Sequence, residues 1–148
     1  MGGRGAWRRS SLEESVEVVL KVLISDKMDP RCVDILEVDE EISVDVRTGL
    51  STPELIDLIG EYQGLVVRSG TEVSTEVIAA ASSLKVIGRA GTGFDNIDVA
   101  AATRGGIIVM NTPGGNSLST AEHTFAMIAA LARHIPQATA SLKDGRWE

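Results

Sequence analysis

The sequence predicts an α/β fold built on a parallel sheet of about five strands. Apolar runs of strand length return roughly every 21 or 22 residues, and each interval has room for a short helix. Most runs are continuous rather than alternating, which is typical of strands buried on both faces. Turn formers and helix-start residues separate the runs. Such a strand–helix series predicts a sheet with helices on both faces.

Five apolar runs are the expected strands: 22–24, 42–46, 65–67, 86–87 and 107–110. Proline at a first helical position and Ser, Thr or Asp at a cap predict a helix after each of the first four. These helices are expected near Pro30, at Thr52-Pro53, after Ser74 and over 99–104. The arrangement that fits best is a flavodoxin-like sheet. The period also suits leucine-rich repeats, but their LxxLxLxxN pattern is absent.

A longer helix is expected after the fifth strand. Turn formers fill 111–117, and Ser119 and Glu122 have the spacing of a capping box. From Ser117 to His134 the middle of the segment is apolar on every face, so we expect a helix that is buried all round. One face of the preceding sheet could cover only one side of it, so we expect a further element to cover the rest, and that element can be absent here.

Length and composition exclude several classes of protein. The 148 residues suit about one domain, and 43% hydrophobic residues suffice for a core. A net charge of -7 and few aromatic residues argue against a nucleic-acid partner. A single cysteine, Cys32, and two isolated histidines, His123 and His134, give neither a disulfide nor a metal site. No apolar run approaches the ~20 residues of a membrane helix.

The N-terminal segment 1–18 differs from the rest of the chain. Its first eleven residues contain Arg4, Arg8 and Arg9 and no acidic residue. We expect a disordered extension in a cytoplasmic protein. A short organelle-targeting segment is the alternative interpretation.

Arginines stand at the carboxyl ends of two strands. Arg68 follows the third strand and Arg89 ends the fourth. Guanidinium groups at neighbouring strand ends predict a site for a small carboxylate or phosphate anion. Nearby hydroxyls and glycines could add hydrogen bonds and let backbone N–H groups approach a ligand; they are Ser69, Thr71, Gly91, Thr92 and Gly93. The alternative is that each arginine only pairs with a surface acid.

The segment 91–96 begins like a dinucleotide-binding fingerprint but does not complete it. Asn96 stands where the third glycine is needed, so we do not expect this loop to hold the pyrophosphate of NAD. Asp95, Asn96 and Asp98 are interpreted as turn and helix-cap residues. A phosphoryl-accepting receiver domain would need an acid at the end of the third strand, where Arg68 stands.

Several motifs together resemble the D-isomer-specific 2-hydroxyacid dehydrogenases, most closely the members that oxidise 3-phosphoglycerate. The similarity extends from about Lys21 to Glu148. The motifs are Leu-Val-Val-Arg-Ser at 65–69, Val-Ile-Gly-Arg-Ala-Gly-Thr-Gly-Phe-Asp-Asn-Ile-Asp at 86–98, Val-Met-Asn-Thr-Pro at 109–113, Gly-Asn-Ser at 115–117 and Ile-Pro-Gln-Ala-Thr-Ala-Ser at 135–141.

This resemblance implies a substrate-binding domain over 19–110. It also implies a hinge and the first helices of an incomplete NAD-binding Rossmann domain over 111–148. Residues implied to bind the anionic 2-hydroxy acid are Arg68, Ser69, Arg89, Gly91 and Asn116, with Thr92 as a contact to NAD. The full-length form is expected to be a homo-oligomer.

The arginine, glutamate and histidine that the family uses for hydride transfer have no motif counterpart in this sequence. We therefore expect no catalytic residue and no activity of the chain alone. The alternatives are an interaction protein that pairs through helix 117–134 and Trp147, or an unrelated flavodoxin-like anion-binding domain. The sequence leaves open whether the substrate is 3-phosphoglycerate or another 2-hydroxy acid.

Overall fold

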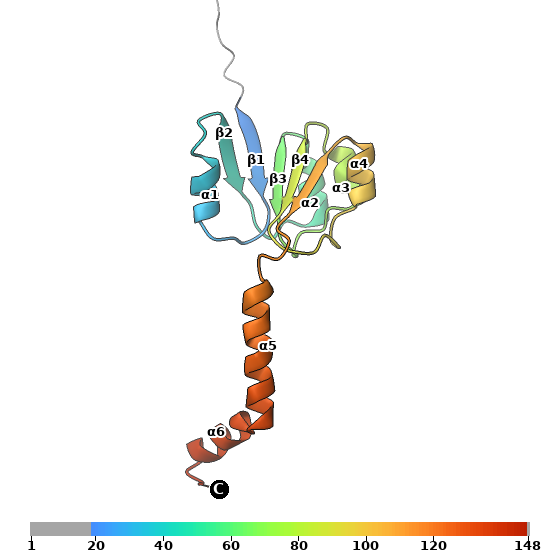
Figure 1. The fold of residues 1–148 in the computed structure, drawn as a ribbon. Helices are drawn as coiled ribbons and strands as arrows, with labels where there is room; N and C mark the ends of the chain where they lie inside the picture. The colour runs from blue at the N-terminus through green and yellow to red at the C-terminus, as the bar shows by residue number, and fades with distance from the viewer. Residues whose placement is uncertain (1–18, 148) are drawn as a thin grey trace, which may run out of the picture.

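The computed structural model describes residues 19–147, and the extension expected at 1–18 lies outside them. All five predicted strands form one parallel sheet with the order β2-β1-β3-β4-β5, which is the flavodoxin-like order. The strands are β1 (Leu20–Ile24), β2 (Ile42–Val46), β3 (Gly64–Val67), β4 (Val86–Arg89) and β5 (Ile108–Asn111). The strand arrows all point to the edge from which the chain leaves the sheet (Figure 1).

The four short helices form where the start signals predict them. They are α1 (Arg31–Leu36), α2 (Thr52–Ile59), α3 (Thr75–Ala80) and α4 (Val99–Arg104). Ser51 and Glu54 form a capping box at the start of α2, and the Asp98 side chain accepts a hydrogen bond from the Ala101 N–H at the start of α4. The interpretation of Asp98 as a helix cap is confirmed.

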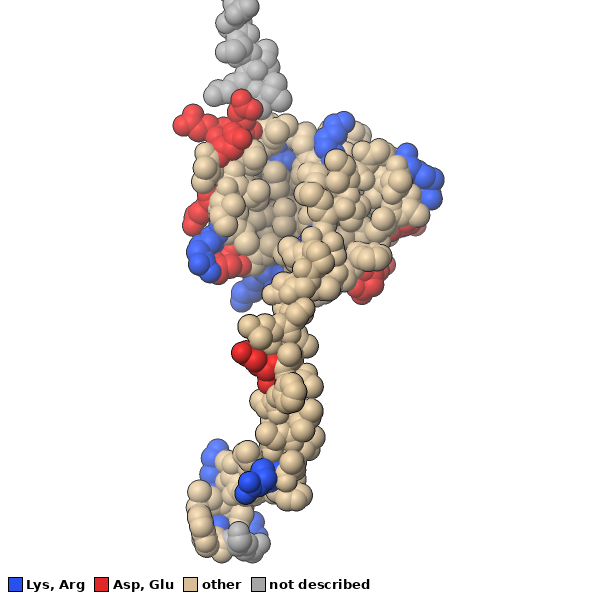
Figure 2. All heavy atoms as spheres, in the orientation of Figure 1, with Lys and Arg blue, Asp and Glu red and all other residues tan. Residues whose placement is uncertain are grey.

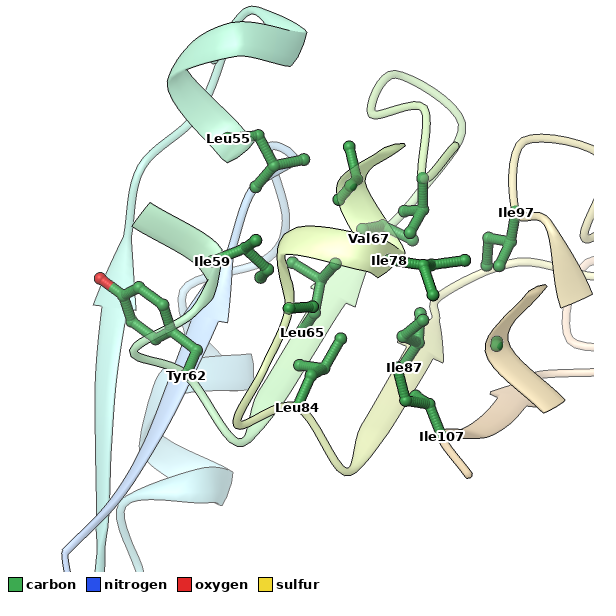
Figure 3. Packing of buried hydrophobic residues seen from close by; sticks show 14 of the residues in the cluster. Leu55, Ile59, Tyr62, Leu65, Val67, Ile78, Leu84, Ile87, Ile97 and Ile107 are labelled. Atoms are coloured by element: carbon green, nitrogen blue, oxygen red, sulfur yellow. The ribbon is translucent and has the colours of Figure 1, made fainter. Parts of the chain in front are cut away.

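The core lies on one face of the sheet, beneath α2, α3 and α4. Leu23, Leu65 and Ile87 of the strands are completely buried there, and Ile59 of α2 and Val77 of α3 pack over the same face. Figure 3 shows these helices and strands contributing to one cluster of side chains. Packing of the helices on this face fixes the strands and therefore the places of their carboxyl ends.

The opposite face of the sheet is covered only in part within residues 19–147, so the expectation of strands buried on both faces holds at Ile24 of β1, which is 1% exposed, and fails at β5. Of the helices in the described residues, α1 alone borders this face, where Leu36 lines an apolar groove with Val22 and Val66. Ile108 and Met110 of β5 are 63% and 55% exposed. The continuous apolar runs thus correctly report apolar side chains on both faces of the strands. In this part of the chain, however, the layer of helices over the second face is incomplete.

The long helix forms as α5 (Ser117–Ala132), followed by α6 (Ile135–Lys143). It begins two residues before Ser119, so the capping box predicted from Ser119 and Glu122 is wrong. Asn116 occupies the cap position, and the Ser119 hydroxyl donates to the Asn116 carbonyl oxygen at 3.1 Å. His134 has a φ of 53° between the two helices.

The burial expected for this helix is not found among the described residues, and neither is the further element that was expected to cover it. α5 projects away from the sheet (Figure 1), and most of its surface in Figure 2 is uncharged. Leu118, Phe125 and Leu131 are 74%, 72% and 67% exposed. The apolar composition is real, but within residues 19–147 only α6 packs substantially against the helix.

Candidate functional site

Arg89 is the buried centre of the predicted anion site. It is the last residue of β4, and its side chain is only 9% exposed. The Arg89 Nε–H donates to the Asn96 amide oxygen at 2.7 Å. One terminal nitrogen lies 3.6 Å from a carboxylate oxygen of Asp95, which is itself 86% exposed. The alternative interpretation was that this arginine only pairs with a surface acid. Arg89 does contact such an acid, Asp95, but the contact is long.

Gly91 leaves room for the Arg89 guanidinium. A Cβ atom added to Gly91 would lie 2.6 Å from a terminal nitrogen of Arg89, so a side chain here would displace the end of the arginine. A Cβ atom added to Gly93 would lie 2.8 Å from a carboxylate oxygen of Asp95 and 3.4 Å, an ordinary contact distance, from the same arginine nitrogen. The sequence suggested that these glycines let backbone N–H groups reach a ligand; the structure adds a role for Gly91 as space for the arginine.

The Arg68 loop is held by a carboxylate from a neighbouring strand. Asp26, just beyond β1, accepts hydrogen bonds from the backbone N–H groups of Arg68, Gly70 and Thr71, at 2.6, 3.3 and 3.1 Å, and from the Thr71 hydroxyl at 3.0 Å. Burial raises the pKa of Asp26, but these hydrogen bonds outweigh it and leave the pKa below its ordinary value. Asp26 thus fixes the main chain that carries Arg68 and Ser69.

Asn96 joins the two arginine loops. Its amide nitrogen donates to the carbonyl oxygens of Arg68 and Thr71, at 2.8 and 2.6 Å, while its amide oxygen accepts from Arg89. The structure therefore brings Arg68 and Arg89 together at the same edge through a third residue.

The sequence did not identify Asp26 or Asn96 as site residues. The flavodoxin-like fold predicted from the sequence makes the first and third strands neighbours, which could have drawn attention to Asp26. No local signal distinguishes Asn96 from an ordinary turn residue.

Arg68 and Ser69 are exposed at this edge. The Arg68 guanidinium donates to the Lys27 carbonyl oxygen at 3.2 Å, and within residues 19–147 it forms no ion pair with a carboxylate. An exposed guanidinium and a buried one at neighbouring strand ends offer forked donors for two anionic groups.

Thr92 and Asn116 lie together where the chain leaves the sheet. The Thr92 hydroxyl donates to the Asn116 amide oxygen at 3.0 Å. The Asn111 amide donates to the Thr92 carbonyl oxygen at 2.7 Å, and the Thr112 N–H donates to the Gly91 carbonyl oxygen at 3.0 Å. A shallow hollow beside them is lined by the first turns of α5. The N-terminal cap residue of α5 is thus hydrogen-bonded directly to the loop that follows Arg89.

In the described part of the chain, no three His, Cys, Asp or Glu side chains gather closely enough to hold a metal ion. None of the helices described is both long and apolar enough to cross a membrane.

The sequence comparisons point to one family. A family model described as "D-isomer specific 2-hydroxyacid dehydrogenase, catalytic domain" matches residues 22–145. D-3-phosphoglycerate dehydrogenases from Sus scrofa and Homo sapiens are each 59% identical to the chain over 128 residues, and the one from Synechocystis is 54% identical over 128 residues. The match covers 86% of this chain but only 24%, 24% and 23% of those relatives, so the chain spans about a quarter of their length.

Solved structures agree with the sequence comparisons. The TT0316 protein from Thermus thermophilus matches with a TM-score of 0.78 and 32% identity, over 87% of this chain and 42% of that one. An NAD+-bound 3-phosphoglycerate dehydrogenase from Entamoeba histolytica matches with a TM-score of 0.67 and 32% identity, over 75% and 38% of the two chains. The alternative of an unrelated flavodoxin-like domain is excluded. The chain belongs to the D-isomer specific 2-hydroxyacid dehydrogenase family.

Proposed function

We propose that residues 19–110 are the substrate-binding lobe of an NAD-dependent D-3-phosphoglycerate dehydrogenase. Such an enzyme transfers the hydride on C2 of 3-phosphoglycerate to NAD, and the hydroxyl proton leaves as 3-phosphohydroxypyruvate forms. The observation that carries the proposal is the pair of arginines at one sheet edge, Arg89 buried and Arg68 exposed, joined through Asn96. Sequence identity of 59% to enzymes of that name supports the choice of substrate.

The proposed ligand has two anionic groups, a carboxylate and a phosphate. Two guanidinium groups can each take one of them, because each offers forked N–H donors that match carboxylate and phosphate oxygens. Ser69 follows Arg68 at the exposed edge and would add a hydroxyl donor. Gly91 contributes by leaving space for the Arg89 guanidinium.

The cofactor would be held mainly by a second domain, whose hinge and first helices we assign to 111–148. Thr92 is the proposed contact of this lobe with NAD, and Asn116 would line the substrate from the hinge side. Their mutual hydrogen bond supports placing both at one cleft. Because no pyrophosphate fingerprint and no catalytic Arg, Glu and His motif occur in the sequence, the chain alone would bind the substrate without oxidising it. The enzyme would be cytoplasmic and homo-oligomeric in its full-length form.

Calorimetric titration of 3-phosphoglycerate into the 148-residue chain tests the substrate role. Arg89→Ala should weaken binding about tenfold or more, because a charge-assisted, partly desolvated contact is lost. Arg104→Ala is the matched control: Arg104 lies at the exposed end of α4, away from the strand ends, and its loss should leave the affinity nearly unchanged. Equal affinity of Arg89→Ala and the parent chain would contradict the proposed grip.

A second candidate function is self-association through α5. It is favoured by the exposure of large apolar side chains along the whole helix, among them Phe125 and Leu131. A second copy of the chain could bury these side chains against its own α5. Sedimentation equilibrium at rising concentration should then show a dimer that Phe125→Glu dissociates. A monomer over the whole concentration range would count against this function.

A further inference from the structure

Asn96 uses every hydrogen-bonding group of its side chain between the two arginines. Its two amide hydrogens reach two carbonyl oxygens of the Arg68 loop, at 2.8 and 2.6 Å, and its oxygen accepts the Arg89 Nε–H at 2.7 Å. A side chain with two donors and one strong acceptor is what this position requires.

The backbone at Asn96 is held as firmly as its side chain. The Asn96 carbonyl oxygen accepts from the Val73 N–H at 2.8 Å, and the Asp98 N–H donates to the Val73 carbonyl oxygen at 3.0 Å. Val73 and Ile97 form a short parallel bridge between the loops that follow β3 and β4. The amide is therefore presented from a fixed main chain.

This arrangement determines how the Arg89 guanidinium lies. With its Nε–H bonded to Asn96, the group is directed across Gly91, and its two terminal nitrogens remain for other partners. Within residues 19–147 these nitrogens have only the long contact with Asp95 at 3.6 Å. Asn96 thus orients the buried guanidinium through a neutral hydrogen bond, so that the positive charge of Arg89 is not neutralised by this contact.

We propose that Asn96 is a positioning residue of the anion site, setting the Arg89 guanidinium and the Arg68 loop in one fixed arrangement. The inference rests on the proposed function and deepens it, because it assigns the placement of the Arg89 guanidinium relative to the Arg68 main chain to a single neutral amide. Asn96 acts through the arginines and touches no reacting atom.

The neutral amide matters as much as its shape. An aspartate at 96 would have the same size and could still accept the Arg89 Nε–H. It could not donate to the carbonyl oxygens of Arg68 and Thr71, and its negative charge would pair with the guanidinium that should face the ligand. Asn96→Asp therefore separates orientation from charge.

The first test compares Asn96→Asp with Gln63→Glu by calorimetric titration of 3-phosphoglycerate into the 148-residue chain. Gln63 precedes β3 at the opposite edge of the sheet, and its side chain also accepts one hydrogen bond and donates another. Both variants add one negative charge and remove one amide. Asn96→Asp should weaken binding about tenfold and Gln63→Glu less than about twofold. Equal affinities of the two variants would overturn the inference.

The second test reads the position of Arg89 directly. The Nε–H of Arg89, assigned in ¹⁵N NMR spectra by its absence from Arg89→Ala, should exchange slowly with water in the parent chain and in Asn96→Asp. In Asn96→Ala it should exchange rapidly. Slow exchange in a folded Asn96→Ala chain would refute the positioning role, and if that variant does not fold, the affinity of Asn96→Asp decides.

The two tests also separate this inference from the proposed function. If the parent chain binds neither 3-phosphoglycerate nor inorganic phosphate, the proposed function fails, while Arg89 Nε–H exchange still supports or refutes the role of Asn96. If the parent chain binds 3-phosphoglycerate and Asn96→Asp binds it equally well, the proposed substrate site is supported and the positioning role of Asn96 is refuted.

Discussion

At the scale of single residues, the site shows how a buried arginine can keep an available charge. A buried guanidinium is costly unless it is hydrogen-bonded. Arg89 meets this need with the neutral Asn96 and with an exposed carboxylate 3.6 Å away. The strand-end pattern was enough to predict Arg68 and Arg89. Asp26 and Asn96 were not predicted, because their contacts with the Arg68 loop join residues 25 to 45 positions apart, and only the neighbouring places of β1 and β3 pointed to Asp26.

Gly91→Ala tests the space beside Arg89. The added methyl group would lie 2.6 Å from a terminal nitrogen of that side chain, so the guanidinium must move. Affinity for 3-phosphoglycerate should fall about fivefold to tenfold, while the free energy of unfolding changes by less than about 1 kcal/mol, because a flexible side-chain end gives way.

Gly88→Ala is the matched control for this change. Gly88 lies in β4, one residue before Arg89, and no atom lies within 4 Å of its added Cβ. Its affinity for 3-phosphoglycerate should equal that of the parent chain. A loss of affinity of the same size in both variants would show that the space beside the guanidinium is not the cause.

Asp26 makes the stability of the Arg68 loop depend on pH. Its folded-state pKa is lowered, so its contribution is fully present above the unfolded value, near 3.8, and is lost as the pH falls through the folded value. Urea unfolding at neutral pH should show Asp26→Asn to be less stable by about 1 kcal/mol, at the low end for charged hydrogen bonds because the group is partly exposed.

The difference between Asp26→Asn and the parent chain should shrink as the pH approaches 3. Asp57→Asn serves as the control, since Asp57 is an exposed residue of α2 whose side chain forms no hydrogen bond within the described residues. A difference that stays constant between pH 7 and pH 3 would show that the Asp26 charge does not hold the loop.

At the scale of helices and strands, the sequence predicted where each element lies in the chain better than it predicted which of its faces are covered. All five strands and all four short helices lie where the apolar runs and start signals indicated. What it could not predict is which faces are covered, because a continuous apolar run reports the side chains and not the neighbours that bury them. For the same reason the exposed surface of α5 and of β5 differs from expectation.

Substituting one buried and one exposed leucine tests this difference between apolar composition and burial through the free energy of unfolding. Leu65 of β3 is completely buried, so Leu65→Ala should lower the free energy of unfolding by about 3 kcal/mol. Leu131 of α5 is 67% exposed and belongs to an equally apolar segment, yet Leu131→Ala should change it by less than about 0.5 kcal/mol. Urea unfolding followed by circular dichroism makes the comparison, and equal losses would mean that α5 is buried in solution.

At the scale of the whole molecule, the sign of the total charge and the sign of the site differ. The chain carries a net charge of -7, yet the edge formed by the ends of β3 and β4 presents two guanidinium groups. Repulsion of an anion by distant carboxylates is screened within about 8 Å at physiological salt. The local arrangement of charge matters more than the total, which is why composition argues against a nucleic-acid partner but not against a small anionic ligand.

The exposed apolar surface of α5 also has a practical consequence for experiments on this chain. Dyes such as ANS fluoresce on binding exposed apolar surface, and that signal is commonly taken as a sign of a molten globule. Here the intact fold already presents Leu118, Phe125, Ile128 and Leu131 to solvent. Dye fluorescence from a well-packed sample would therefore report the helix, and loss of packing must be judged from near-ultraviolet circular dichroism or NMR dispersion instead.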